Sequence, residues 1–386
     1  MASRSNTSRR TVLTALLAGG LSVPLLGAAP ASSAPAAVLA LPSPSGHRPV
    51  GRRTLHLVDR HRADPWVPTA RGRELMVSVS YPARPSGGAP AAYMTESEAQ
   101  RLLEAKGLAG VVPATTVAGT RTHARADAPP APGCFPLVLL SPGFSMPRTT
   151  LTALAGELAA GGYVAAAVDH AYESVGTEFP GGRVPSCVAC DRVGADVEEA
   201  AVVQGRAADL SFVIDELTGH RRAGALARVI DAQRIGVAGH SIGGAAAMAT
   251  MAADRRVRAG VNLDGGFFVR DAGSGLGRRP FMMVGAEDVH GPAHTGSDWA
   301  ATWGRLRGWK RWLTVAGAGH FSFTDIPWLA DRLGLADPEV PLSGERGWYI
   351  TRDYVRAFFD LHLRGIPQPL LQSPTSAHPE VEFHRP

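Results

Sequence analysis

One serine of this chain lies in surroundings that suit nucleophilic chemistry. Ser241 belongs to the segment Gly239-His-Ser-Ile-Gly243, after the apolar run 235–238 and before the small, apolar stretch 242–253. A buried strand that turns sharply into a helix at a serine holds its hydroxyl in a strained, accessible position, and flanking glycines make room for the crowded backbone. The start of the helix also favours a developing negative charge. The pattern predicts that Ser241 is a catalytic nucleophile.

Such a serine needs a base, and we expect it near the end of the domain. His320 lies in the glycine-rich segment 317–321, directly after the apolar run 311–315. A histidine in this place can take the proton of the serine hydroxyl and return it to the leaving group. His240 is next to the nucleophile, but the geometry of the turn points its side chain elsewhere, so we interpret it as structural.

Two carboxylates compete to orient His320. Asp264 ends the apolar run 257–263, and Asp288 follows the next run, 280–284. Either one could hold the imidazole in the correct tautomer. The residues alone leave both Asp264 and Asp288 as candidates.

The segments that carry these residues alternate between strands and helices. We expect an antiparallel pair of strands at 53–59 and 74–81, followed by an irregular stretch with a short helix at 96–106. From residue 135 the pattern predicts strands at 135–140, 163–168, 235–239, 257–263, 280–284 and 311–315, and helices at 149–160, 195–218, 242–253, 297–307 and 346–364. Apolar strands separated by helices predict an α/β fold with a mostly parallel sheet covered on both faces. Ligands of such sheets bind at the carboxyl ends of the strands.

The combination resembles the α/β-hydrolase fold. In that fold, one N–H group for the oxyanion comes from a loop after an early strand, and the other comes from the residue after the nucleophile. The segment Ser141-Pro-Gly-Phe144 follows the strand at 135–140. The resemblance therefore implies that the backbone N–H groups of Phe144 and Ile242 stabilise the oxyanion.

Within this fold, the stretch from about Gly51 to Gly365 resembles the plasma-type platelet-activating factor acetylhydrolases and their bacterial relatives. The resemblance rests on Ser141-Pro-Gly-Phe144, Ala167-Val-Asp-His170, Gly239-His-Ser-Ile-Gly-Gly244, Asn262-Leu-Asp-Gly265 and Gly319-His-Phe-Ser-Phe-Thr-Asp325. In that family the acid follows the strand after the nucleophile, and Asp264 has the matching spacing. The resemblance implies the triad Ser241, Asp264 and His320. The chain departs from the family at Pro142, where many members have a histidine.

A second resemblance, to streptomycete-type lipases and cutinases, favours the other acid. Those enzymes share the Gly-His-Ser-x-Gly-Gly turn, but their acid lies in a Gly-Ala-x-x-Asp loop like Gly285-Ala-Glu-Asp288. We expect Asp264 to be the acid, because the segment around it is otherwise unexplained, and we keep Asp288 as the alternative.

Two of the three cysteines form the segment Cys187-Val-Ala-Cys190. Nothing nearby completes a zinc site, and the setting of a thioredoxin motif is absent. We therefore expect a disulfide between Cys187 and Cys190 that pins the loop 171–194, and we hypothesise that this loop forms part of the acyl-pocket wall. Cys134 is expected to be a buried, inert thiol. No metal or organic cofactor is implied.

The N-terminus resembles a twin-arginine export signal. Ser8-Arg-Arg-Thr-Val-Leu13 precedes an apolar stretch that glycine and proline interrupt and that is short for a membrane anchor. We expect a signal peptide at 1–34, a Pro/Ala/Ser linker at 35–48 outside the fold, a hydrolase domain at 49–365 and a loosely held tail at 366–386. The protein is accordingly expected to be secreted.

Composition and charge exclude other classes. The chain is 45% hydrophobic and 19% charged, and its net charge is +5. Three arginines of the expected signal supply most of that excess, so a nucleic-acid partner is not expected.

We expect a secreted serine esterase or lipase that acts on short-acyl (phospho)lipid esters, with transient contact with lipid surfaces. The alternatives are a cutinase or triglyceride lipase, a peptidase or amidase, and a non-catalytic binding protein. The sequence leaves the oligomeric state open.

Overall fold

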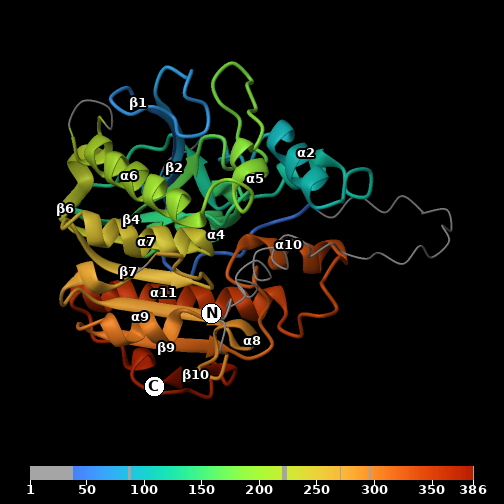
Figure 1. Cartoon of the computed structure of the whole chain (residues 1–386). Helices are drawn as coiled ribbons and strands as arrows, with labels where there is room; N and C mark the ends of the chain where they lie inside the picture. The colour runs from blue at the N-terminus through green and yellow to red at the C-terminus, as the bar shows by residue number, and fades with distance from the viewer. Residues whose placement is uncertain (1–37, 86–87, 220–223, 270, 295–296, 386) are drawn as a thin grey trace, which may run out of the picture.

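The computed structural model describes residues 38–85, 88–219, 224–269, 271–294 and 297–385, so the signal peptide expected at 1–34 lies outside the described residues. Within them, ten strands form a single sheet in the order β10-β9-β8-β7-β6-β4-β5-β2-β1-β3 (Figure 1). The strands are β1 (Val50–Asp59), β2 (Arg73–Pro82), β3 (Ala124–Ala126), β4 (Phe135–Ser141), β5 (Val164–His170), β6 (Ile230–His240), β7 (Val257–Leu263), β8 (Phe281–Ala286), β9 (Lys310–Val315) and β10 (Val381–His384).

The sheet is mostly parallel. The strands from β5 through β4, β6, β7 and β8 to β9 all pair in parallel with their neighbours. At one side, β2 and β1 add the expected antiparallel pair, and at the other β10 runs antiparallel to β9. The expected α/β fold is confirmed.

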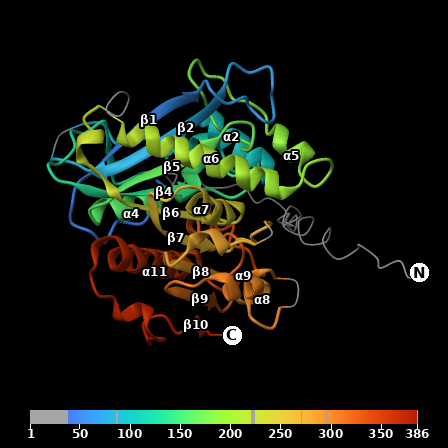
Figure 2. The same cartoon turned by 60° about the vertical axis from the view of Figure 1, so that its left-hand side comes forward.

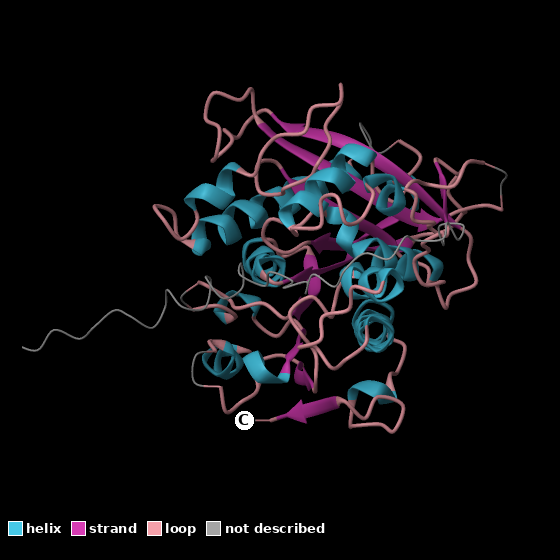
Figure 3. Cartoon of the chain, turned by 90° about the vertical axis from the view of Figure 1, so that its right-hand side faces the viewer, coloured by secondary structure: helices cyan, strands magenta, loops and turns pink. Residues whose placement is uncertain are grey.

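Helices cover both faces of the sheet (Figure 3). The helices are α2 (Glu96–Ala105), α3 (Ala114–Ala118), α4 (Thr152–Ala160), α5 (Val188–Arg192), α6 (Glu199–Thr218), α7 (Ile242–Ala253), α8 (Glu287–His290), α9 (Trp299–Arg305), α10 (Asp325–Leu333) and α11 (Gly344–Arg364). None of the described helices is both long and apolar enough to cross a bilayer.

Alternation along β4 explains the two layers. Because successive side chains of a strand point to opposite faces, Leu137 and Leu139 join the core under α6 and α7, whereas Val138 and Leu140 join the core under α4 and α11. The helices α6 and α7 lie side by side in both views (Figure 1 and Figure 2). Burial of both faces is the reason that these strands are apolar throughout.

The expected elements are largely confirmed, with differences at their ends. Strand β7 has the predicted bounds, whereas α6 begins at Glu199 instead of residue 195. The short elements α3, β3, α5, α8 and β10 were not predicted, because each has too few residues to show a clear period. Helix α10 was not predicted either. Cys134 is exposed, so the expectation of a buried thiol is wrong: it precedes the first residue of β4.

Two segments expected outside the domain pack against it. Leu39 and Leu41 are buried in the core, and the carbonyl of Ala40 accepts a hydrogen bond from Trp328 Nε1 at 2.9 Å. In the tail, β10 extends the sheet and buries Val381. The expected linker is therefore wrong for residues 38–48, and the expected loose tail is wrong. A few well-placed apolar side chains are enough to attach segments whose overall composition is that of a linker.

Candidate active site

Ser241 lies at the sharp turn between β6 and α7. Its backbone is strained, with φ 56° and ψ −128°. A Cβ atom at Gly239 would lie 2.1 Å from the carbonyl oxygen of Gly243, and one at Gly243 would lie 2.1 Å from the carbonyl oxygen of Ser141. The two flanking glycines are thus required by backbone crowding, as the pattern predicted.

His320 and Asp264 meet beside this turn. His320 follows β9, and its Nδ1 donates a hydrogen bond to Oδ2 of Asp264 at 2.6 Å. Asp264 directly follows β7 and has a positive φ of 57°, and its other oxygen accepts the N–H of Ala286 at 2.6 Å. With Nδ1 engaged, His320 is held in the tautomer that leaves Nε2 able to accept a proton.

Asp264 is suited to remain ionised although it is buried. Burial favours its neutral form, but the hydrogen bonds from His320 and Ala286 and the nearby His290 hold the pKa of this carboxyl below its ordinary value. A permanently charged carboxylate next to His320 stabilises the imidazolium that forms when the histidine takes a proton.

The alternative acid lies elsewhere. Asp288 is exposed on α8, and among the described residues its carboxylate has no hydrogen bond to His320. Helix α8 begins at Glu287, directly after β8. Asp288 therefore lies on this helix and is exposed to solvent. The geometry therefore brings Ser241, Asp264 and His320 to one edge of the sheet and leaves Asp288 outside the group.

The two expected oxyanion donors border Ser241. Ile242 is the first residue of α7, so its N–H has no partner within the helix. The N–H of Phe144 has no acceptor among the described residues. The loop that carries Phe144 is close to the serine, because a Cβ atom at Gly143 would lie 3.5 Å from Cβ of Ser241. Two free N–H groups beside the expected nucleophile can stabilise a tetrahedral oxyanion.

His240 contacts the main chain of His320. Its Nε2 donates a hydrogen bond to the carbonyl oxygen of His320 at 2.7 Å, and the two rings are 4.6 Å apart. Burial, together with the charge of His320, lowers the pKa of His240 to about 3. His240 is therefore a neutral donor, which agrees with its interpretation as structural.

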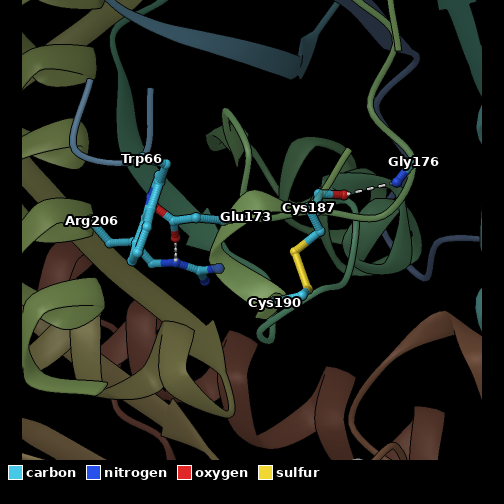
Figure 4. Close-up of a disulfide and its surroundings, with 7 residues drawn as sticks. Trp66, Glu173, Gly176, Cys187, Cys190 and Arg206 are labelled. Atoms are coloured by element: carbon cyan, nitrogen blue, oxygen red, sulfur yellow. Dashed lines mark hydrogen bonds and ion pairs between the residues drawn. A yellow bond between two sulfur atoms is a disulfide. The ribbon is translucent and has the colours of Figure 1, made fainter. Parts of the chain in front are cut away.

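A buried ion network supports the loop 141–145, which carries the Phe144 N–H. The sequence did not predict this network. Arg206 of α6 donates to the carbonyl oxygen of Pro142 at 2.5 Å and pairs with Glu173 at 2.7 Å. Figure 4 shows the contact between Arg206 and Glu173. The carbonyl of Glu173 in turn accepts the N–H of Ser145. A charged residue in the apolar stripe of α6 was the available signal. The network anchors both sides of the loop that presents the Phe144 N–H.

The same network contains a second serine–histidine–aspartate chain. His170 donates from Nδ1 to Asp209 at 2.7 Å, and its Nε2 accepts the hydroxyl of Ser141 at 3.1 Å. All three side chains are at most 2% exposed, so no substrate can reach Ser141. These three hydrogen-bonded side chains support the loop and are not a second reaction site.

Cys187 and Cys190 form a disulfide next to this network (Figure 4). Cys187 packs in one apolar cluster with Ile242 and Ala245 of α7, and the half-buried side chains of Phe144, Tyr172 and Phe268 lie against that cluster. The pinned loop thus borders the oxyanion side of the site.

Among the described residues, no group of three or more histidine, cysteine or acidic side chains is arranged to hold a metal ion.

Comparisons with known proteins find relatives over much of the chain. The chain matches the family described as platelet-activating factor acetylhydrolase, isoform II, over residues 98–179 and 213–336, which is more than half of its length. A probable 1-alkyl-2-acetylglycerophosphocholine esterase from Arthroderma benhamiae is 27% identical over 95% of this chain and 99% of the relative. Platelet-activating factor acetylhydrolase from Cavia porcellus is 25% identical over 40% of this chain and 37% of its own.

A solved structure is similar over nearly the whole chain. The ferulic acid esterase from Streptomyces cinnamoneus superposes with a TM-score of 0.80 at 47% sequence identity, covering 90% of this chain and all of that one. These relatives are all esterases or acetylhydrolases. The chain therefore belongs to the platelet-activating factor acetylhydrolase, isoform II, family, and it is a carboxylic ester hydrolase with the α/β-hydrolase fold.

Proposed function

We propose that this protein is an exported serine esterase that cleaves short-acyl esters through a covalent acyl-enzyme on Ser241. The observation that carries the proposal is the 2.6 Å hydrogen bond from His320 to Asp264, next to a serine in a strained turn. A nucleophile, a base and an orienting acid together are the requirements of this mechanism.

In the proposed reaction, Ser241 attacks the ester carbonyl while His320 takes its proton. Asp264 stabilises the imidazolium, and the N–H groups of Phe144 and Ile242 bind the oxyanion. Each such donor contributes about 3 kcal/mol of transition-state stabilisation. His320 then protonates the departing alcohol oxygen, and the acyl group stays on Ser241. Water, activated by the same histidine, releases the acid and restores the serine.

Two acyl groups are favoured by different observations. Curated relatives are named for an acetyl ester of an ether phospholipid, which supports a short acyl chain on a lipid and transient contact with lipid surfaces. The similar solved structure is named for ferulic acid esters. Half-buried Phe144, Tyr172 and Phe268 would suit the flat ring of such an acyl group. Acetyl esters are our first candidate, and hydroxycinnamoyl esters are the second.

One set of assays tests the mechanism and the acyl preference. We expect the purified protein to hydrolyse p-nitrophenyl acetate faster than the longer p-nitrophenyl esters, and methyl ferulate serves as the aromatic comparison. A fluorophosphonate should add one label, which peptide mass spectrometry should locate on Ser241. Ser241→Ala should fold normally and lose nearly all activity. Full activity in this variant would refute the mechanism.

We also propose export by the twin-arginine route. Arg9 and Arg10 precede the apolar stretch, and the Cys187–Cys190 disulfide is typical of an oxidising compartment. Replacing both arginines by lysine should leave the protein inside the cell, as immunoblots of cells and medium would show. Unchanged amounts in the medium would contradict this route.

A further inference from the structure

One lysine next to the site has a charge that no described residue neutralises. The chain has two lysines, Lys106 and Lys310. Lys310 donates to the carbonyl oxygens of Trp303 and Leu306. The ammonium of Lys106, by contrast, has no hydrogen bond or ion pair among the described residues and lies 4.1 Å from the centre of the Phe321 ring.

The neighbouring acids are already engaged. Glu98 pairs with Arg148, Glu104 pairs with Arg101 and Gln100, and Asp325 accepts the N–H of Ala153. The remaining acid of α2, Glu96, is exposed in the first turn of the helix, about 15 Å along its axis from Lys106. Lys106 is half-buried, and burial lowers its pKa below the ordinary value. A partly desolvated ammonium without a counter-ion is unfavourable, so a bound anion would stabilise it.

Lys106 lies on the side of the site where the alcohol portion of the ester is expected. The Phe321 ring, on which the ammonium lies, is 5.3 Å from the His320 ring and 5.8 Å from the His240 ring. In the proposed reaction His320 protonates the departing alcohol, so the alcohol portion of the ester must lie on the His320 side. Helix α2, which ends just before Lys106, and α10, which starts just after Phe321, lie at the same side of the molecule (Figure 1).

We propose that Lys106 is a specificity-determining residue whose ammonium pairs with an anionic group, a phosphate or a carboxylate, on the alcohol portion of the ester. This inference rests on the proposed esterase function. The acyl side of the site is apolar around Ile242, whereas the alcohol side presents the ammonium of Lys106, which has no counter-ion in the described part of the chain. Charge therefore selects the alcohol, and apolar contact selects the acyl group.

A pair of acetate esters that differ only in charge tests the proposal. In 4-acetoxybenzoate the alcohol portion carries a carboxylate, and in methyl 4-acetoxybenzoate it is neutral. We expect Lys106→Met to lower kcat/KM for the anionic ester about tenfold and to change that for the neutral ester less than twofold. Lys106→Arg should keep the preference. High salt should weaken it in the wild type.

The matched control is Arg101→Met, which removes an exposed cation from α2, the helix that ends just before Lys106, and should leave the ratio of the two rates unchanged. A monomeric acetylated phospholipid, compared with its neutral diglyceride counterpart, distinguishes phosphate from carboxylate as the preferred anion. Equal losses on the charged and neutral esters, or no loss at all, would overturn the role of Lys106. A wild-type protein inactive on both esters would instead refute the proposed function, and this inference with it.

Discussion

Nε2 of His240 donates a hydrogen bond to the carbonyl oxygen of His320 at 2.7 Å. The residue beside the expected nucleophile thus holds the main chain of the expected base, while Asp264 holds its ring. Two separate contacts position His320, one at the backbone and one at Nδ1. Both come from residues at the ends of neighbouring strands.

Loss of the backbone contact should impair the reaction more than substrate binding. We expect His240→Phe to lower kcat by about 10- to 100-fold with a smaller change in KM, by analogy with residues that orient metal ligands. His240→Gln should keep most of the activity, because its amide can donate to the same carbonyl oxygen. Steady-state kinetics of both variants measure this. Equal activity of the Phe and Gln variants would contradict the positioning role.

His240 should also make stability depend on pH. Its pKa is about 3 in the folded protein and about 6.5 in the unfolded chain. Between these values the unfolded state binds the proton and the folded state does not, so the stabilisation is complete above about pH 6.5 and is lost as the pH falls toward 3. Urea unfolding should show a slope of about 1.4 kcal/mol per pH unit from this residue. His240→Gln should remove that part of the slope, and an unchanged slope would contradict the buried, neutral state.

The two candidate acids should differ sharply in kinetics. Asp264→Asn leaves His320 in the wrong tautomer, so we expect kcat to fall about 10⁴-fold with substrate binding largely kept. Asp288→Asn changes an exposed helix residue and should keep near wild-type activity. An inactive Asp288 variant beside an active Asp264 variant would move the acid to the later strand.

Arg206 should be important for stability because it is buried between two acceptors. Arg206→Met leaves Glu173 with one ion-pair partner fewer and frees the Pro142 carbonyl, so we expect a loss of about 3–5 kcal/mol in the free energy of unfolding. Arg192→Met, which breaks an exposed pair with Asp196, is the control and should change it by less than about 1 kcal/mol. Similar losses in both variants, measured by urea denaturation, would argue against the network.

The disulfide should affect selectivity as well as stability. The closed loop is short, so we expect the Cys187→Ser/Cys190→Ser variant to lose only about 2 kcal/mol of stability. If the loop 171–194 forms a wall of the acyl pocket, the same variant should accept longer p-nitrophenyl esters more readily. An unchanged chain-length preference would remove the loop from the acyl pocket.

Local sequence was sufficient to nominate Ser241 and His320 as candidate site residues. The glycines at 239 and 243 are needed wherever a strand turns this sharply into a helix, because a side chain there would collide with backbone atoms. Strand and helix periods likewise predicted most of the sheet, since buried parallel strands must be apolar along their whole length. These signals depend on neighbours in the chain and therefore appear in its sequence.

Other features were decided by contacts between distant segments. Asp264 and Asp288 both follow strands of the same parallel sheet. Only the direction of the backbone after each strand decides which of the two carboxylates lies next to His320. The pairing of β10 with β9, and the meeting of Lys106 with Phe321, join segments with no local pattern in common. Such contacts depend on how the layers pack, because the free energy that fixes them comes from burial across the whole domain and not from any one segment.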